Sequence, residues 1–307
     1  MTNLFAPLDI RDEVAQALAD NRAVVALEST IVVHGLPAPD NLEVAAECDA
    51  AVRRAGAVPA AIGLVGGRVV VGLTLDELRE LSEPDRAAAK LSARDIGVAM
   101  AQRADGATTV AGTIAAAAAA GITVMATGGL GGVHRGAVES FDESADLTAL
   151  SRTPVIVVAS GVKSILDVGA TLERLDSLGV PVVGYRTDRF PGFYRRDSGF
   201  GVEWRLESPD AVAESFENHA WFSPTGMLVA NPVAEADELD AAVHEAALRA
   251  ALDEVTSSGA TGKSVTPAML SRFASQTGGA SVRTNRALVV ANCALAGEIA
   301  VAWAARS

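Results

Sequence analysis

The stretch VIVVASGVKSILDVGATLERLDSLGVPVVGY, residues 155–185, carries the order of elements that decides the fold. Its two ends, VIVVAS at 155–160 and PVVGY at 181–185, are short apolar runs rich in β-branched residues, which is typical of strands buried on both faces. The amphipathic segment 165–178 lies between them, and we expect its helix to start near Ser164. Two strands joined by a helix predict a parallel pair.

The same alternation recurs along the chain. Further buried strands are expected in the runs VVALE (24–28), ITVMAT (122–127) and MLVAN (227–231). Amphipathic helices are expected at 41–56, 94–104, 109–120 and 208–219, and three more near 237–257, 265–275 and 281–304. VPAAIGLVGGRVVVG, residues 58–72, predicts an added β-hairpin that turns at Gly66 and Gly67. The sequence therefore predicts a single three-layer α/β/α domain over residues 1–307, with a largely parallel central sheet and C-terminal helices.

Composition limits the classes of function. The 307 residues are 50% hydrophobic but only 4% aromatic, and the formal net charge is -13. Such a charge repels nucleic acid polymers, whereas a small anionic substrate can still bind where cations and backbone amides gather. The N-terminus has no signal-peptide pattern, and Cys48 and Cys293 are expected to be buried free thiols, so we expect a cytoplasmic protein. The apolar run 110–127 is broken at Gly121 and predicts a helix followed by a strand, not a membrane span.

Polar residues follow several of the predicted strands. Glu28 ends VVALE, Thr127 ends ITVMAT, Lys163 comes three residues after VIVVAS, and Asn231 ends MLVAN. Because ligands of parallel α/β sheets bind outside the carboxyl ends of the strands, these residues mark the expected site. A carboxylate at the place of Glu28 suits a general acid, although a structural role for a buried glutamate is the alternative.

Only three of the 25 basic residues are lysines, at positions 90, 163 and 263. Lysines that remain in an arginine-rich chain are enriched in functional ones, because arginine cannot replace a deprotonatable amine. At the end of a buried strand, the amine of Lys163 could act as a nucleophile, or its stem could pack on the sheet with its head in solvent. Lys90 precedes SARD (92–95), a helix start that could bind phosphate, although a solvated loop lysine would look the same.

Two glycine-containing motifs do not fit nucleotide-binding patterns. ATGKS at 260–264 would place the first glycine of a P-loop at Ser257. GGLGGVHRG at 128–136 would place the last glycine of the dinucleotide fingerprint at His134. The second motif still permits close approach of the backbone to a ligand.

An acidic segment and one asparagine complete the candidates. Asp142 and Asp146 flank a helix start at Ser144, where they could bind Mg²⁺ or Mn²⁺ or simply complement the helix dipole, and the residues alone favour the second reading. Asn285 shares a helix face with Leu288 and other apolar residues, so it is expected to point inward, either to buried backbone or to a ligand.

Seven ordered blocks closely resemble the pseudouridine-5'-phosphate glycosidases, a family that is also similar to proteins of indigoidine gene clusters. The blocks are ALESTIVVHGLPAPDN (26–41), KLSARDI (90–96), GATTVAGT (106–113), ATGGLGGVHRGA (126–137), FDESADL (141–147), GVKSILD (161–167) and LVANP (228–232). The resemblance covers almost the whole chain. It implies reversible cleavage of the carbon–carbon glycosidic bond of pseudouridine 5'-phosphate to uracil and ribose 5-phosphate.

The resemblance also assigns roles. It implies that Lys163 is the nucleophile that forms an imine with C1' of the ring-opened ribose, that Glu28 is the proton donor, and that Asp142 is associated with one Mn²⁺ per subunit. The implied substrate-binding residues are Lys90, Val110, Ser144, Ala145, Asp146 and Asn285, with His134 a candidate at the phosphate. The implied partners are two further copies of the chain in a homotrimer, and a separate pseudouridine kinase that supplies the substrate.

Two other functions are compatible with the same residues. Glu28 and Asp146 could act as the carboxylate pair of a glycosidase for another nucleotide if Lys163 were structural. A non-catalytic sensor of sugar phosphates would need the phosphate site but not Lys163.

Overall fold

The computed structural model describes residues 8–258 and 272–306. Within these ranges eleven strands form one sheet, of which nine follow the order β1-β4-β3-β2-β7-β9-β13-β11-β12, while β5 and β6 extend it beside β3. These strands are β1 (Leu8–Ile10), β2 (Val24–Glu28), β3 (Val58–Val65), β4 (Arg68–Val71), β5 (Ala89–Leu91), β6 (Gly106–Thr108), β7 (Val124–Ala126), β9 (Ile156–Ala159), β11 (Val182–Tyr185), β12 (Trp204–Leu206) and β13 (Met227–Ala230). Two short strands, β8 (Val133–His134) and β10 (Leu166–Asp167), pair separately.

The centre of the sheet is parallel, as the sequence predicts. β2 pairs in parallel with β3 and β7, and the parallel order continues through β9, β13, β11 and β12. All four residues of β9 are fully buried, which explains why this strand is a continuous apolar run. The predicted hairpin is also present, because β3 and β4 are antiparallel.

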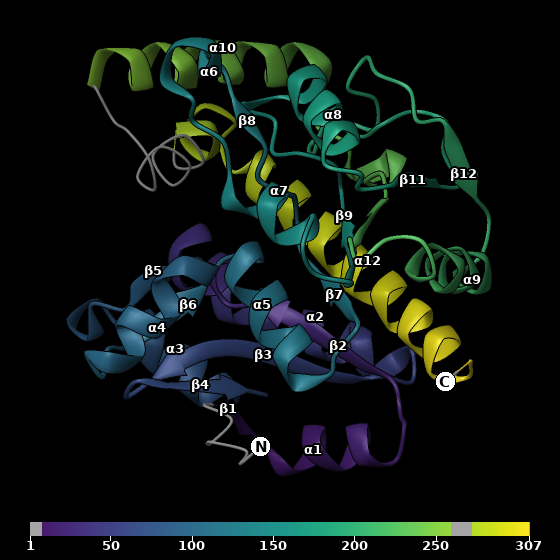
Figure 1. Cartoon of the computed structure of the whole chain (residues 1–307). Helices are drawn as coiled ribbons and strands as arrows, with labels where there is room; N and C mark the ends of the chain where they lie inside the picture. The colour runs from purple at the N-terminus through teal and green to yellow at the C-terminus, as the bar shows by residue number, and fades with distance from the viewer. Residues whose placement is uncertain (1–7, 259–271, 307) are drawn as a thin grey trace.

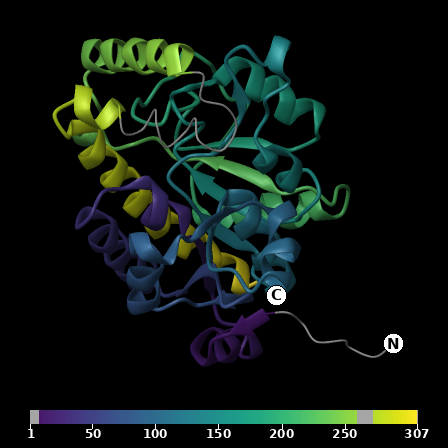
Figure 2. The same cartoon turned by 90° about the vertical axis from the view of Figure 1, so that its left-hand side faces the viewer.

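Helices cover both faces of this sheet (Figures 1 and 2). They are α1 (Asp12–Ala19), α2 (Asp40–Arg54), α3 (Leu75–Ser82), α4 (Ala93–Ala101), α5 (Val110–Ala120), α6 (Ala137–Ser140), α7 (Ala145–Leu150), α8 (Val168–Ser177), α9 (Pro209–Ala220), α10 (Ala241–Ser258) and α12 (Ala280–Ala304). A single-turn π-helix, η1 (Ile31–Gly35), follows β2. On one side α12 packs against α2 and α9, and on the other α5 packs against α4 and α7. The α/β class and the C-terminal helices are thus confirmed.

α12 is the longest of the described helices and crosses the centre of the molecule, as the yellow helix of Figure 1 shows. By length and mean hydropathy, 1.8 over its most apolar window, it could span a membrane. It instead contacts β2, β7 and β9, and it carries the buried polar residues Asn285 and Asn292 toward the ends of these strands. This is the pattern of a core helix in a globular protein.

The helix start expected near Ser164 is wrong, because α8 begins at Val168 with Asp167 as its N-cap. Residues 164–167 are used otherwise: the Ser164 hydroxyl donates to the Gly192 carbonyl at 2.8 Å, and Leu166–Asp167 pairs with Val133–His134. Lys163 therefore lies in a loop and not at a helix N-terminus. The predicted helix at 265–275 falls largely outside the described residues, and Lys263 falls wholly outside them.

Candidate active site

A cleft of about 710 Å³ opens at the carboxyl ends of β2, β7 and β9. Because these three strands are neighbours, the residues that follow them are brought to one edge of the sheet. The cleft contains all ten of the site residues proposed from the sequence: Glu28, Lys90, Val110, His134, Asp142, Ser144, Ala145, Asp146, Lys163 and Asn285. Asn231 is placed differently, since its amide donates to Asn292 at 2.9 Å.

Glu28 is held by two threonine hydroxyls. Thr127, which follows β7, donates to Oε1, and Thr30, just before η1, donates to Oε2. Both carboxylate oxygens therefore have a donor from a different segment, and the side chain is fixed in orientation. Thr30 was not identified from the sequence, although it lies two residues after Glu28, within the same ALEST motif.

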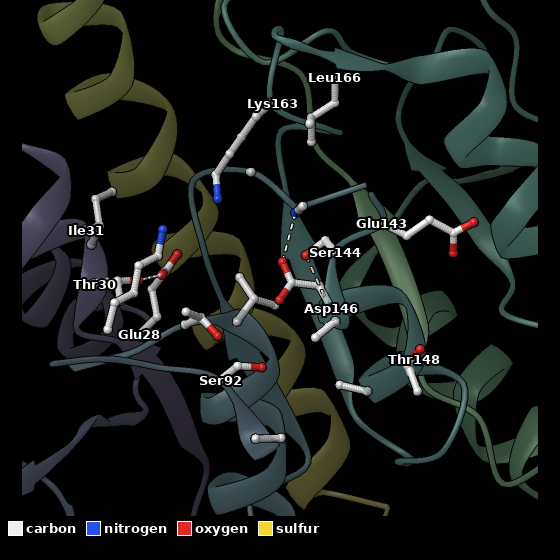
Figure 3. Close-up of a pocket in the computed structure, with 18 of the residues that line it drawn as sticks. Glu28, Thr30, Ile31, Ser92, Glu143, Ser144, Asp146, Thr148, Lys163 and Leu166 are labelled. Carbon is white, nitrogen blue, oxygen red and sulfur yellow. Dashed lines mark hydrogen bonds between the residues drawn. The ribbon is translucent and has the colours of Figure 1, made fainter. Parts of the chain in front are cut away.

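Lys163 faces Glu28 from the opposite side of the cleft (Figure 3). Its backbone is anchored to the glycine-rich loop, because its N–H donates to the Leu130 carbonyl at 3.1 Å. Gly161, two residues earlier, has φ +75°, and a methyl group there would overlap the Pro191 carbonyl oxygen. The loop therefore requires glycine at this position. Within the described part of the chain the Lys163 amine forms no salt bridge, which leaves it available to a ligand.

Asp146 joins two walls of the cleft. Its carboxylate accepts hydrogen bonds from the N–H of Ala111 in α5 and the N–H of Gly131 in the glycine-rich loop, each at 2.9 Å. The side chain is only 6% exposed. Ser144 caps α7 by accepting from the Asp146 N–H at 3.2 Å (Figure 3). Because both carboxylate oxygens are occupied, Asp146 is poorly suited to act as the second carboxylate of a glycosidase pair.

Three helix N-termini line the same cleft. They are the starts of α4, α5 and α7, whose residues at the wall of the cleft are Ser92, Val110 and Ser144. Lys90 lies in β5, and the carbonyl of its neighbour Leu91 accepts from the Thr109 N–H, so this lysine is close to the start of α5. Backbone amides at helix starts together with an ammonium group can bind a phosphate.

Two buried polar atoms of residues that line the cleft, Asn285 Oδ1 and His34 Nε2, have no hydrogen-bond partner within the described residues. Both atoms are inaccessible to solvent, so a ligand in the cleft would reach them only after a shift of the cleft wall. Asn285 is 4% exposed and points inward as predicted, while its neighbour on the same face, Asn292, donates to the Thr127 carbonyl at 2.8 Å.

His134 and Asp142 form a second polar pair at the cleft. His134 Nδ1 lies 3.8 Å from Asp142 Oδ2, and the His134 N–H donates to the Asp142 carbonyl at 3.0 Å. Burial lowers the pKa of His134, the Asp142 carboxylate opposes that shift, and Lys163 adds to it. In residues 8–258 and 272–306, no three His, Cys, Asp or Glu side chains gather into a metal-binding cluster. A divalent ion at Asp142 would thus need most of its ligands from water and substrate, which Mg²⁺ and similar ions accept.

Comparisons with known proteins identify the family of the chain. Residues 13–302 match the model of a family described as indigoidine synthase A like protein. The chain is 59% identical to the pseudouridine-5'-phosphate glycosidase of Salinispora tropica, over 96% of this chain and 91% of that protein. It is 52% identical to the enzyme of the same name from Streptomyces griseus, over 99% and 94%.

Two solved structures share the whole fold. The prealnumycin C-glycosynthase AlnA in complex with ribulose 5-phosphate superposes with a TM-score of 0.89 at 41% identity, covering 97% of both chains. An indigoidine synthase A-like protein from Thermotoga maritima superposes with a TM-score of 0.87 at 35% identity, covering 98% of both.

Proposed function

Because the chain belongs to the indigoidine synthase A like family, we propose a mechanism by which this cleft performs the reaction of a pseudouridine-5'-phosphate glycosidase. The enzyme cleaves the carbon–carbon glycosidic bond of pseudouridine 5'-phosphate reversibly, giving uracil and ribose 5-phosphate. The observation that carries the mechanism is the placement of Lys163 and Glu28 on facing sides of one cleft (Figure 3).

A carbon–carbon glycosidic bond has no leaving oxygen or nitrogen that an acid can simply protonate. An amine solves this problem, because its lone pair can form a C=N bond as the adjacent carbon–carbon bond breaks. We assign this role to Lys163: its amine bonds to C1' as the C1'–O4' bond breaks and the ribose ring opens, and O4' takes up the proton that the amine gives up. The nitrogen lone pair then forms the iminium as the bond from C1' to the uracil C5 breaks and leaves its electron pair on C5. Water hydrolyses the iminium, which releases ribose 5-phosphate and restores the amine.

Glu28 supplies the proton that the departing base needs at C5. The hydroxyls of Thr30 and Thr127 fix its carboxyl group at the side of the cleft that faces Lys163. In the reverse reaction the same carboxylate takes up the proton as uracil bonds to C1'. A single positioned acid–base group therefore serves both directions.

The phosphate of the substrate belongs at the starts of α5 and α7. Val110, Ser144 and Ala145 line the cleft there. The helix dipoles favour a dianion at the N–H groups other than those of Ala111 and Asp146, which Asp146 and Ser144 already occupy. Lys90 and His134 add donors beside this subsite, and we place the sugar beside Asn285, which also lines the cleft.

We further propose that Asp142 binds a Mn²⁺ ion. Its side chain is about one-third exposed at the cleft, so water and substrate oxygens could complete the ion's coordination. When bound, the ion would supply positive charge to the oxygens of the substrate. Dialysis against a chelator followed by titration with Mn²⁺ should show saturable binding that Asp142→Asn weakens.

The assembly and the pathway are likewise proposals. The family resemblance supports a homotrimer in the cytoplasm, where the buried free thiols Cys48 and Cys293 would stay reduced. Light scattering of the purified chain tests the trimer. A separate kinase acting on pseudouridine would have to supply the phosphorylated substrate.

The central experiment follows uracil release from pseudouridine 5'-phosphate in the presence of Mn²⁺. The wild type should cleave the substrate, and borohydride added with ribose 5-phosphate should leave a reduced sugar on Lys163. Lys163→Arg should lose both properties while staying folded. Cleavage at the normal rate by this variant would refute the imine mechanism, and a folded wild type without turnover would favour a sugar-phosphate sensor.

A further inference from the structure

Phe193 lines the cleft from the irregular segment 186–203 that joins β11 to β12. Its φ is +65°, a left-handed backbone conformation that bulky residues rarely adopt. Its ring is packed into the protein, because only 2% of the residue is exposed. Residues in such strained conformations persist only where the surrounding structure holds them, and they are concentrated at active sites. This combination of strain, burial and position indicates that Phe193 contributes to the site.

The backbone at Phe193 is tied to residues 160–164, which we call the lysine loop. The Phe193 N–H donates to the Ser160 carbonyl at 2.9 Å, and the Ser164 hydroxyl donates to the Gly192 carbonyl at 2.8 Å. These two hydrogen bonds hold both ends of the lysine loop to the segment that carries the ring. The lysine loop and Phe193 are therefore fixed relative to each other.

The ring of Phe193 packs on the glycine-rich loop, over Gly129. A methyl group at Gly129 would lie 2.5 Å from Cδ2 and 2.7 Å from Cε2 of the ring, and 3.5 Å from Cγ of Lys163. The ring and the lysine stem therefore approach the same point. The φ of Gly129 is not in the left-handed region, so its backbone would accept a side chain, and the ring is what excludes one.

The ring has little room to withdraw from this contact. Tyr194 packs against it edge to face, with 4.6 Å between the ring centroids, and Tyr194 is itself buried. On the other side, the glycine-rich loop is bonded to the lysine loop, because the Leu130 N–H donates to the Gly161 carbonyl at 2.9 Å. Phe193 is therefore a wedge between two loops that are already joined, and the lysine stem lies next to this wedge.

We propose that Phe193 is a positioning residue that aims the amine of Lys163 across the cleft at C1' of the sugar. This inference rests on the proposed function. The lysine stem has several rotatable bonds, and the ring occupies part of the space into which it could otherwise turn. A nucleophile held in one orientation reacts faster, because less conformational freedom is lost on the way to the transition state. The phosphate subsite, at the starts of α5 and α7, is formed by other residues, so the ring should affect the rate of bond formation and not the binding of the sugar phosphate.

The rate at which borohydride traps ribose 5-phosphate on Lys163 tests this role, because trapping requires the amine to reach C1' and needs no base. Phe193→Ala should slow trapping at saturating sugar about tenfold and leave the half-saturating concentration of ribose 5-phosphate within about twofold. Phe216→Ala is the matched control, since Phe216 is also 2% exposed but lies in α9, where it packs against Trp303. This control should lower the urea midpoint yet trap at the wild-type rate. Wild-type trapping by folded Phe193→Ala, or an equal loss of trapping in Phe216→Ala, would overturn the proposal.

Gly129→Ala probes the same contact with the ring in place, so it decides the question even if Phe193→Ala does not fold. The new methyl group must displace the ring or the lysine stem, and trapping should slow about fivefold or more. In the double variant the space is open, so the methyl group should slow trapping less than about twofold beyond Phe193→Ala alone. Unchanged trapping in Gly129→Ala, or the same loss in both backgrounds, would overturn this proposal alone. A wild type that traps no sugar would overturn the role of Lys163 as well.

Discussion

Replacement of Asp146 by asparagine tests whether this residue organises the cleft or only touches the substrate. Its carboxylate accepts two backbone N–H groups at 2.9 Å, from Ala111 and Gly131, and it is 6% exposed. Asparagine keeps one acceptor oxygen but turns an NH₂ group toward the other backbone donor. The change removes one charge-assisted hydrogen bond, worth about 1.5–3 kcal/mol, and leaves a buried N–H unpaired. We therefore expect Asp146→Asn to reduce the free energy of unfolding by about 2–4 kcal/mol.

Urea unfolding followed by circular dichroism measures this loss as a lower midpoint with an unchanged slope. Asp167→Asn is the matched control, because Asp167 accepts a single backbone N–H, from Ala170 at 2.9 Å, at the partly buried start of α8. The free energy of unfolding of that variant should be lower than that of the wild type by about 1 kcal/mol or less. If the free energy of unfolding of Asp146→Asn is within about 0.5 kcal/mol of the wild-type value, the two hydrogen bonds of Asp146 do not hold α5 to the glycine-rich loop. An increase in KM alone would then identify a substrate contact.

Three further perturbations test other parts of the structure. Gly161→Ala should lower the free energy of unfolding by about 3 kcal/mol or more, because the new methyl group clashes with the Pro191 carbonyl and the backbone is strained at positive φ. Gly121→Ala, at a similar φ of +83° but with open space around it, should lower it by only about 1 kcal/mol. Equal urea midpoints for the two variants would contradict the crowding at Pro191. Thr127→Val should lower kcat about fivefold with little change in KM, because Glu28 loses one of its two hydroxyl donors. Thr127→Ser keeps the hydroxyl and should retain the wild-type rate. Equal activity of the two variants would show that the hydrogen bond from Thr127 to Glu28 does not matter. Burial lowers the pKa of all four histidines in the folded chain, so the unfolded chain binds more protons than the folded chain below about pH 6.5. The free energy of unfolding should therefore fall as the pH decreases from 7.5 to 5.5. A free energy of unfolding that stays constant or rises across that window would refute this.

The parallel sheet was predictable because each of its central strands is a complete apolar run between amphipathic helices. β9 and β13 illustrate this, since every residue in both is buried. The shorter strands were not found. β5, β6 and β12 have three residues each, too few for a periodic pattern, and they form only because neighbouring strands pair with them.

The candidate site was predictable in its members but not in its contacts. Position after a strand singled out Glu28 and Lys163, and the family motifs supplied most of the others. The bonds from Asp146 to Ala111 and Gly131 join segments up to 35 residues apart, which no local pattern reveals. The start of α8 was misplaced because the apolar Ile165 and Leu166 fit a helical pattern, although Leu166 pairs with His134 in a short strand.

The position of α12 has a consequence for the order in which the enzyme becomes active during synthesis. This helix ends at Ala304, yet Asn285 lines the cleft and Asn292 binds the carbonyls of Thr127 and Gly128, beside the catalytic strands. A nascent chain that already contains Glu28 and Lys163 therefore lacks one wall of its cleft until α12 leaves the ribosome. The site that we propose around Lys163 would therefore be complete only after α12 has been synthesised and packed against β2, β7 and β9.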